Sequence, residues 1–193
     1  SHAEEVAQEK LTYLTVGTKN SKLGKYISDL LITKYIISTV SNDMIGIEYS
    51  SSLKNIYSIM VGIAHGLGYG DNFVSVLISH CSKEMSDFIK AVHKTNRKIN
   101  HSAYLGDLLV TTYSSFSRNR TFGNMIGKGY SINSAKAEMN MIVEGYYATK
   151  NAFILSKKLS TKFLIIDFCY KILFENKSAS RQMKELSKNL YWG

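Results

Sequence analysis

The residues of this chain best suited to chemistry form the run Ser117-Arg118-Asn119-Arg120, with two polar pairs upstream of it. Arginine carries a permanently charged, forked set of donors, and serine and asparagine add a hydroxyl and an amide, so such a run can hold a phosphate group. Gly106-Asp107 lies about ten residues before this run, and Lys54-Asn55 lies about sixty residues before it. A lysine and a carboxylate can together serve a proton transfer. The spacing alone therefore indicates an anion site with an acid–base pair.

The charge of the chain is unevenly distributed. Its 193 residues carry a formal net charge of +9, yet residues 1–45 hold five lysines and five acidic residues. The whole excess falls in residues 46–193. A basic segment favours anionic partners such as phosphorylated metabolites, nucleotides, nucleic acid or an acidic membrane surface. Lysines on solvated faces would account for the surplus equally well.

Cysteine, histidine and apolar runs limit the class of protein. Cys81 and Cys169 are too few for a disulfide framework or a metal site. Both lie among apolar residues, so we expect them to be reduced thiols in the core, as in a cytoplasmic protein. The five histidines have no metal-ligand spacing, so no metal is predicted. The longest apolar run, 163–174, is interrupted by Asp167 and Lys171, so we expect no membrane span and no signal peptide.

The elements that must position these residues divide the chain in two. Residues 11–16 and 35–40 read as strands and 21–32 as a helix, a strand-helix-strand unit that would be the last part of a larger sheet. From about residue 42 the pattern is helical. A long helix is predicted over 43–65, ended by Gly66, Gly68 and Gly70, and Asp71 is predicted to cap a helix to about Val92. After a polar stretch, helices are expected over 103–113, 118–127, 131–138, 143–159, 161–175 and 178–188. The fold class is therefore mainly α.

Six segments of the chain carry a resemblance to a known family. They are Ile45–Glu48, Leu53–Asn55, Gly66–Asn72, Gly106–Leu108, Ser117–Arg120 and Val143–Gly145. In this order and at these spacings, from residue 1 to about Tyr191, the chain resembles the bacterial NAD(P)-dependent glycerol-3-phosphate dehydrogenases. The opening Ser1–Val6 resembles that family's Gly-Pro-Ser-x-Ala-Glu-Glu-Val segment.

The resemblance implies a domain plan. Residues 44–193 would be an all-helical substrate domain of the 6-phosphogluconate dehydrogenase C-terminal-like type, and residues 1–43 the tail of an NAD(P)-binding Rossmann domain. The family's glycine-rich fingerprint is not replaced by Gly66-x-Gly-x-Gly70, because that run follows a predicted helix, whereas the fingerprint follows a strand. The main binding half for NAD or NADP is therefore expected to lie outside this chain, and the chain alone is expected to be inactive.

The resemblance also implies the chemistry and its residues. The reaction would be hydride transfer between a nicotinamide and C2 of the pair dihydroxyacetone phosphate and sn-glycerol 3-phosphate, which supplies phospholipid synthesis. Negative charge grows on the ketone oxygen, so a proton donor must lie there. Lys54 would be that donor and Asp107 its orienting carboxylate. The substrate-binding residues implied are Lys54, Asn55, Asp107, Thr111, Ser117, Arg118 and Asn119, and the cofactor-binding residues are Arg118, Ile142 and Glu144.

Several positions leave alternatives or depart from the family pattern. Asp107 would otherwise be an ordinary helix cap after Gly106, and Glu144 is equally well read as the first-turn acid of a helix. Ser1 matches the serine of the family's Gly-Pro-Ser segment. The family commonly has glycine where this chain has Tyr104, and cysteine where it has Thr112, which changes the wall of the site more than its chemistry.

Two other functions remain open from the sequence. The first is a non-catalytic helical module that binds nucleic acid or acidic lipid, although the basic residues form no dense run and aromatic residues are not interleaved with them. The second is a related dehydrogenase of the same superfamily with another substrate. We expect a phosphorylated three-carbon substrate, a homodimer because an exposed sheet edge invites pairing, no nucleic acid and no integral membrane contact.

Overall fold

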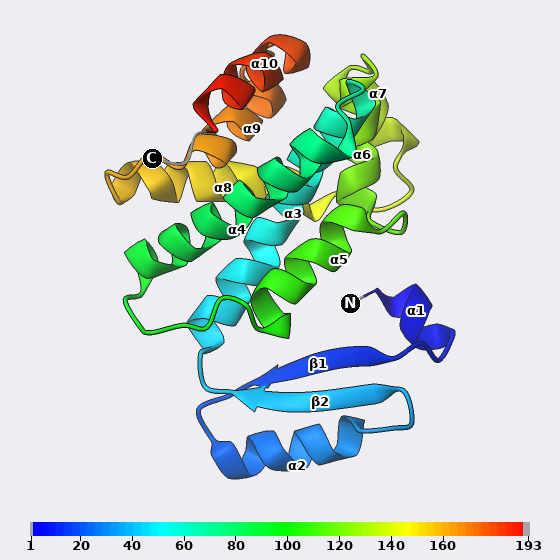
Figure 1. The fold of residues 1–193 in the computed structure, drawn as a ribbon, viewed down its shortest axis with the longest axis vertical. Helices are drawn as coiled ribbons and strands as arrows, with labels where there is room; N and C mark the ends of the chain where they lie inside the picture. The colour runs from blue at the N-terminus through cyan, green and yellow to red at the C-terminus, as the bar shows by residue number, and fades with distance from the viewer. Residues whose placement is uncertain (1, 191–193) are drawn as a thin grey trace.

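The N-terminal part of the chain forms the predicted strand-helix-strand unit. The computed structural model describes residues 2–190. After a short helix, α1 (Ala3–Ala7), strands β1 (Thr12–Gly17) and β2 (Ile36–Ser41) pair in parallel, joined by α2 (Ser21–Leu31). Gly24 lets α2 approach the sheet, since a Cβ there would lie 2.6 Å from Val40 Cγ1. In Figure 1 this unit lies at one end of the helical part, with α2 outermost.

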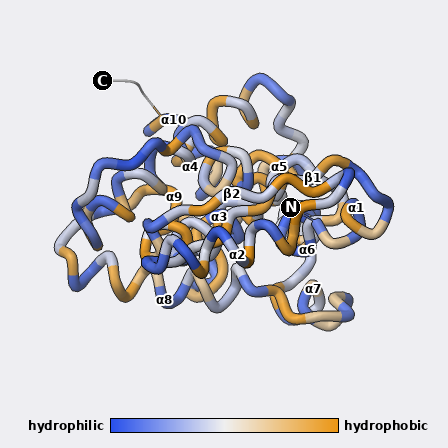
Figure 2. The backbone as a smooth tube through the Cα atoms, turned by 90° about the horizontal axis from the view of Figure 1, so that it is seen from below, coloured by the Kyte–Doolittle hydropathy of each residue, from blue (hydrophilic) through white to orange (hydrophobic). Residues whose placement is uncertain are grey.

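The remaining elements are helical, and one of them is buried almost throughout its second half. They are α3 (Met44–Gly66), α4 (Asp71–Val92), the π-helical turn η1 (Ser102–Gly106), α5 (Asp107–Tyr113), α6 (Arg118–Gly127), α7 (Ile132–Glu138), α8 (Glu144–Lys158), α9 (Leu164–Phe174) and α10 (Ala179–Asn189). Residues 55–64 of α3 are all buried. A helix that is apolar on every side belongs to a core, and α3 runs between α4, α5, α6 and α8 (Figure 1). Figure 2 shows the strand pair lying across one end of these helices.

The ends of α3 are set by its flanking residues. Asp43 Oδ1 accepts from Gly46 N at 3.1 Å and caps the N-terminus. At the other end Gly68 has a φ of +84°, and Tyr69 N donates to Ala64 O at 3.0 Å, which ends the helix as predicted. The prediction that Asp71 caps α4 is wrong. Gly70 is the cap, and Asp71 is the first helical residue, where its negative charge interacts favourably with the helix dipole.

Two pairs of glycines hold α3 against α6. Gly62 and Gly66 are one turn apart on α3, and Gly123 and Gly127 are one turn apart on α6. A Cβ at Gly62 would collide with the carbonyl oxygen of Arg120, and one at Gly123 with that of Ile59. The two backbones therefore touch. This close crossing brings the start of α6 alongside the middle of α3.

The segment before α5 departs from the predicted helix over 103–113. Residues Ser102–Gly106 form a π-helical turn, and the α-helix begins at Asp107. The Tyr104 hydroxyl in this turn donates to Asp43 Oδ2 at 2.5 Å, and Arg97 Nε donates to the same oxygen at 2.5 Å. Burial would raise the pKa of Asp43, but the hydrogen bonds from Arg97 and Tyr104 leave it lowered. A charged Asp43 thus ties the start of α3 to the turn that presents Asp107.

The later helices lie within a few residues of their predicted ranges, with one instructive shift. Helix α9 was expected from 161 and begins at Leu164. Its first N–H groups are bound by Glu84 of α4, whose carboxylate accepts from Ile165 N at 2.7 Å and Ile166 N at 3.1 Å. Within residues 2–190, no helix is both long and apolar enough to cross a membrane. In that same range no group of three His, Cys, Asp or Glu side chains is placed to hold a metal ion.

Candidate active site

Lys54 and Asp107 form the centre of the site. Lys54 lies on α3 and Asp107 opens α5, and Lys54 Nζ lies 2.5 Å from Asp107 Oδ2. The two side chains are only 17% and 19% exposed. Asp107 does not cap its own helix, where Gly106 holds that position, so the alternative of an ordinary cap is wrong. Burial would raise the pKa of Asp107, but its net pKa is lowered, with the Lys54 ammonium the largest opposing influence. The structure therefore presents an ammonium held by a charged carboxylate.

Thr111 lies one helical turn after Asp107, and its hydroxyl is already engaged. Its Oγ1 donates to Asp107 O at 2.6 Å, and the residue is buried. Thr112 is wholly buried and donates to Leu108 O at 2.9 Å and Leu109 O at 3.0 Å within its own helix. Both threonines thus satisfy their hydroxyl protons on α5, and Thr111 is left with lone pairs to offer a ligand.

Two asparagines join three helices at the level of Lys54. Asn119 Nδ2 of α6 donates to Asn55 Oδ1 of α3 at 2.9 Å, and both residues are nearly buried, at 7% and 8% exposed. Gly145 N of α8 donates to Asn119 Oδ1 at 2.9 Å, and Asn55 Nδ2 donates to Glu144 Oε2 at 3.2 Å. The N–H of Gly145 requires the Asn119 oxygen on its side, so both amide orientations are fixed. Glu144 is both the first residue of α8 and a partner of Asn55.

Ser117 and Arg118 differ sharply in accessibility. Ser117 is buried and caps α6, its Oγ accepting from Arg120 N at 3.3 Å and lying 2.9 Å from Ser58 Oγ. Arg118 is exposed, and its Nη1 lies 3.5 Å from Met141 Sδ. Arg118 therefore reaches toward the loop before α8, in which Ile142 is 70% exposed. A free-standing guanidinium here can receive an anion from solvent.

The predicted residues fall into two hydrogen-bonded groups and an exposed rim. Hydrogen bonds or ion pairs link Lys54 with Asp107, and Asn55 with Asn119 and Glu144. Arg118 and Ile142 are exposed and lie at the rim, on the side of the loop before α8. Ser1 lies outside the described residues.

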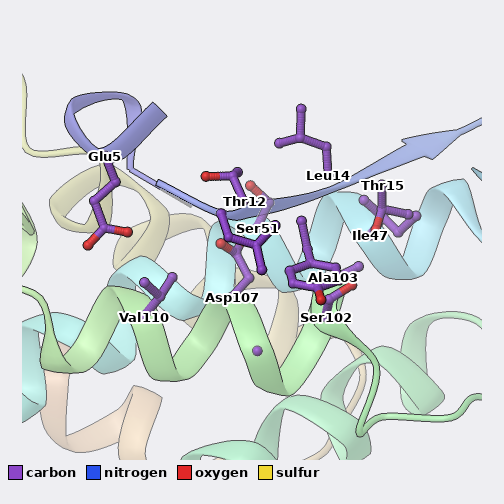
Figure 3. Close-up of a pocket in the computed structure, with 13 residues that line it drawn as sticks. Glu5, Thr12, Leu14, Thr15, Ile47, Ser51, Ser102, Ala103, Asp107 and Val110 are labelled. Carbon is purple, nitrogen blue, oxygen red and sulfur yellow. The ribbon is translucent and has the colours of Figure 1, made fainter. Parts of the chain in front are cut away.

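A pocket of about 360 Å³ opens beside Asp107, between β1 and the helices α3 and α5. Figure 3 shows Thr12 and Leu14 of β1 on one side and Ser51, Asp107 and Val110 on the other. Ser51 and the β1 residues were not identified from sequence. For Ser51 a signal existed, because it lies three residues before Lys54 on one helix, a spacing that places two side chains on the same face.

The fold agrees with comparisons to known proteins. Residues 43–184 match the family described as NAD-dependent glycerol-3-phosphate dehydrogenase C-terminus. This chain belongs to that family.

Named relatives of the glycerol-3-phosphate dehydrogenase family match nearly the whole chain. Glycerol-3-phosphate dehydrogenase [NAD(P)+] of Fusobacterium nucleatum is 38% identical over 186 residues, covering 96% of this chain and 56% of the relative. The protein of the same name from Staphylococcus aureus is 36% identical with the same coverage. The expected membership of this dehydrogenase family is thus confirmed.

Solved glycerol-3-phosphate dehydrogenases share the fold. The crystal structure of the enzyme from Coxiella burnetii superposes with a TM-score of 0.92 at 30% identity, over 96% of this chain and 57% of that one. The enzyme from Saccharomyces cerevisiae, at 21% identity and a TM-score of 0.85, shows the same fold. The expected fold class is confirmed. This chain spans about half the length of the relatives it matches.

Proposed function

We propose that this chain supplies the substrate domain of an NAD(P)-dependent glycerol-3-phosphate dehydrogenase. The observation that carries the proposal is the Lys54–Asp107 pair at 2.5 Å, beside a pocket, in a chain whose relatives are named for this activity. Residues 44–193 would form the substrate domain, and residues 1–43 would complete a Rossmann domain. The enzyme would interconvert dihydroxyacetone phosphate and sn-glycerol 3-phosphate.

The proposed chemistry assigns one task to each group. NAD or NADP, when bound, supplies or accepts the hydride at C2 of the substrate. Lys54 gives a proton to the C2 oxygen during ketone reduction and takes one back in the reverse direction, which balances the hydride. Asp107 holds the Lys54 ammonium in place and supports its positive charge. Arg118 binds the substrate phosphate with a charged donor set.

The residues at the exposed rim of the site are suited to contact one end of a nicotinamide cofactor. Arg118 is exposed and lies against Met141, next to the exposed Ile142, so a cation and an apolar side chain adjoin at the rim. Glu144 follows this loop as the first residue of α8, and its side chain accepts a hydrogen bond from Asn55. These residues would contact the nicotinamide end, while the 193 residues carry no glycine-rich fingerprint after a strand. The chain alone is therefore proposed to be inactive.

The cellular setting is proposed with the activity. The product would supply phospholipid synthesis in the cytoplasm.

Leu23, Tyr26 and Leu30 form an exposed apolar stripe on α2, at the sheet end of the molecule. We propose that this end is covered by the rest of the Rossmann domain and that the enzyme is a homodimer. Light scattering of the complete enzyme would report a mass of one chain rather than two if the dimer is wrong.

The experiment joins this chain to the part of the Fusobacterium nucleatum relative that it does not match. In this joined enzyme, NAD(P)H oxidation is followed with dihydroxyacetone phosphate and with unphosphorylated dihydroxyacetone, and the chain alone serves as the blank. Turnover that requires the phosphate supports both the reaction and the phosphate site. Turnover with neither ketone would contradict the proposal, and turnover by the chain alone would contradict its dependence on a second half.

Neither alternative gains an observation of its own. The relatives and the solved structures that match are dehydrogenases, so a helical module for nucleic acid or acidic lipid is not favoured. A dehydrogenase with another substrate would be recognised in the same assay, as NAD(P)H oxidation with a different ketone and none with dihydroxyacetone phosphate.

A further inference from the structure

Ser58 of α3 is a wholly buried hydroxyl that lies between two helix ends. It follows Lys54 by one helical turn, and its Oγ is 2.9 Å from Thr111 O and 2.9 Å from Ser117 Oγ. Thr111 lies in the last turn of α5, and Ser117 caps the first turn of α6. One side chain of α3 thus touches the end of the helix that carries Asp107 and the start of the helix that carries Arg118.

The direction of these hydrogen bonds follows from donor counting. Thr111 O can only accept, so Ser58 places its single proton there. Ser117 must then donate its proton to Ser58 Oγ, and its own oxygen accepts from Arg120 N at 3.3 Å. A chain of three hydrogen bonds therefore runs from the Arg120 amide through two hydroxyls to the Thr111 carbonyl. Such chains strengthen one another in a buried setting.

Each end of this hydrogen-bond network pairs with a backbone group that has no partner within its own helix. The last four carbonyls of a helix have no intrahelical donor, and Ser58 supplies one to Thr111 O. The first four N–H groups have no intrahelical acceptor, and Ser117 supplies one to Arg120 N only while its own rotamer is held. Ser117 is buried and its proton is engaged by Ser58, so its hydroxyl is directed into the protein.

We propose that Ser58 is a positioning residue that holds the first turn of α6, and with it Arg118, in register with Lys54 and Asp107. This inference rests on the proposed function. Ser58 touches neither substrate nor cofactor and acts through Ser117 and Thr111. Its loss frees the Ser117 rotamer and loosens the first turn of α6, while the Lys54–Asp107 ion pair keeps its own contact. Binding of the substrate phosphate by Arg118 should therefore weaken more than proton transfer by Lys54.

The test compares Ser58→Ala with Ser156→Ala. Ser156 of α8 is also a buried hydroxyl, but it donates within its own helix, to Phe153 O at 2.7 Å, so Ser156→Ala controls for the loss of a buried hydroxyl away from the site. In the joined enzyme, Ser58→Ala should lower the preference for phosphorylated over unphosphorylated ketone about tenfold, the size expected for one misplaced charged hydrogen bond. Turnover of unphosphorylated dihydroxyacetone should be unchanged, and Ser156→Ala should alter neither quantity.

A second readout needs no turnover. Amide hydrogen exchange of the 193-residue chain should show the Arg120 N–H exchanging about tenfold faster in Ser58→Ala, as expected when one hydrogen bond is lost, with the buried α3 amides such as Ile59 unchanged. If the joined enzyme reduces neither ketone, the proposed function fails, yet this measurement still decides whether Ser58 holds the first turn of α6.

Three results would overturn the proposal. The first is an unchanged phosphate preference in Ser58→Ala. The second is an equal loss of turnover with both ketones that Ser156→Ala reproduces. The third is an unchanged exchange rate of the Arg120 N–H. Should Ser58→Ala fail to fold, Ser58→Cys retains a weaker donor in a slightly larger side chain. It should shift the preference and the exchange rate in the same direction by a smaller factor, and no shift in it would contradict the proposal.

Discussion

Asn55 and Asn119 share a hydrogen bond of 2.9 Å, and each directly follows a charged residue of the site. Asn55 follows Lys54 on α3, and Asn119 follows Arg118 on α6. Both amides are nearly buried and fixed by the Gly145 N–H. The separation of Lys54, the proposed proton donor, from Arg118, the proposed phosphate ligand, is therefore set by a rigid pair of amides, supported by the glycine crossing of the same two helices.

Arg118→Ala in the joined enzyme should reduce the preference for phosphorylated ketone by about 10- to 100-fold, the value of one or two charged hydrogen bonds. The measurement is the ratio of kcat/KM for dihydroxyacetone phosphate and dihydroxyacetone. Arg181→Ala is the matched control, because Arg181 is exposed on α10. An unchanged ratio in Arg118→Ala would place the phosphate elsewhere.

Gly123→Ala should lower the free energy of unfolding by about 1–3 kcal/mol, because the new methyl group forces apart two touching backbones. The nearest atom to that methyl is the carbonyl oxygen of Ile59, which cannot move independently of α3. Gly70→Ala is the control without a steric conflict, since no atom lies within 4 Å of its added Cβ. Because Gly70 caps α4, this variant should lose only the preference for glycine over alanine at a helix cap. Urea unfolding measures both, and equal stability of the two variants would show that the crossing tolerates side chains.

Asp43 should make stability fall in acid. The pKa of Asp43 is lower in the folded protein than the ordinary value of 3.8. Its contribution is therefore present above about pH 4 and is lost as the pH falls through the lowered folded value. Asp43→Asn should be less stable than the parent by about 1–3 kcal/mol at neutral pH, and the gap should narrow toward pH 3.

Urea titrations from about pH 3 to pH 6 check this pH dependence. Asp29→Asn, which removes the carboxylate of an exposed ion pair with Lys25, should change stability by less than about 0.5 kcal/mol. A gap between Asp43→Asn and its parent that stays constant over the whole range would exclude titration of Asp43 as the cause.

The sequence predicted those features that local chemistry determines. Gly68 ends α3 because only glycine adopts its positive φ readily. The helix expected over 118–127 begins at Arg118 and ends at Gly127. The alternation of residue types typical of strands predicted β1 and β2. The resemblance pointed to Lys54 and Asp107, which lie fifty-three residues apart and are paired in the structure.

The features that escaped prediction depend on residues far away in the chain. The π-helical turn before Asp107 is held by Tyr104 bonding to Asp43, sixty-one residues earlier. The late start of α9 is due to Glu84, eighty-one residues before Ile165. Ser58 looks like an ordinary core position in the sequence, because neither Thr111 nor Ser117 is near it along the chain. The role of Ser117 as a substrate ligand stays a prediction, since its hydroxyl is buried and engaged.

The most direct test of the account is the turnover of Lys54→Ala in the joined enzyme with dihydroxyacetone phosphate. Loss of the proton donor should lower kcat by about 10²- to 10⁴-fold, with folding checked by circular dichroism. Lys83→Ala, which removes an exposed lysine paired with Asp87, is the control and should keep full turnover. A kcat for Lys54→Ala close to that of the parent would contradict the assignment of Lys54 and, with it, the proposed mechanism.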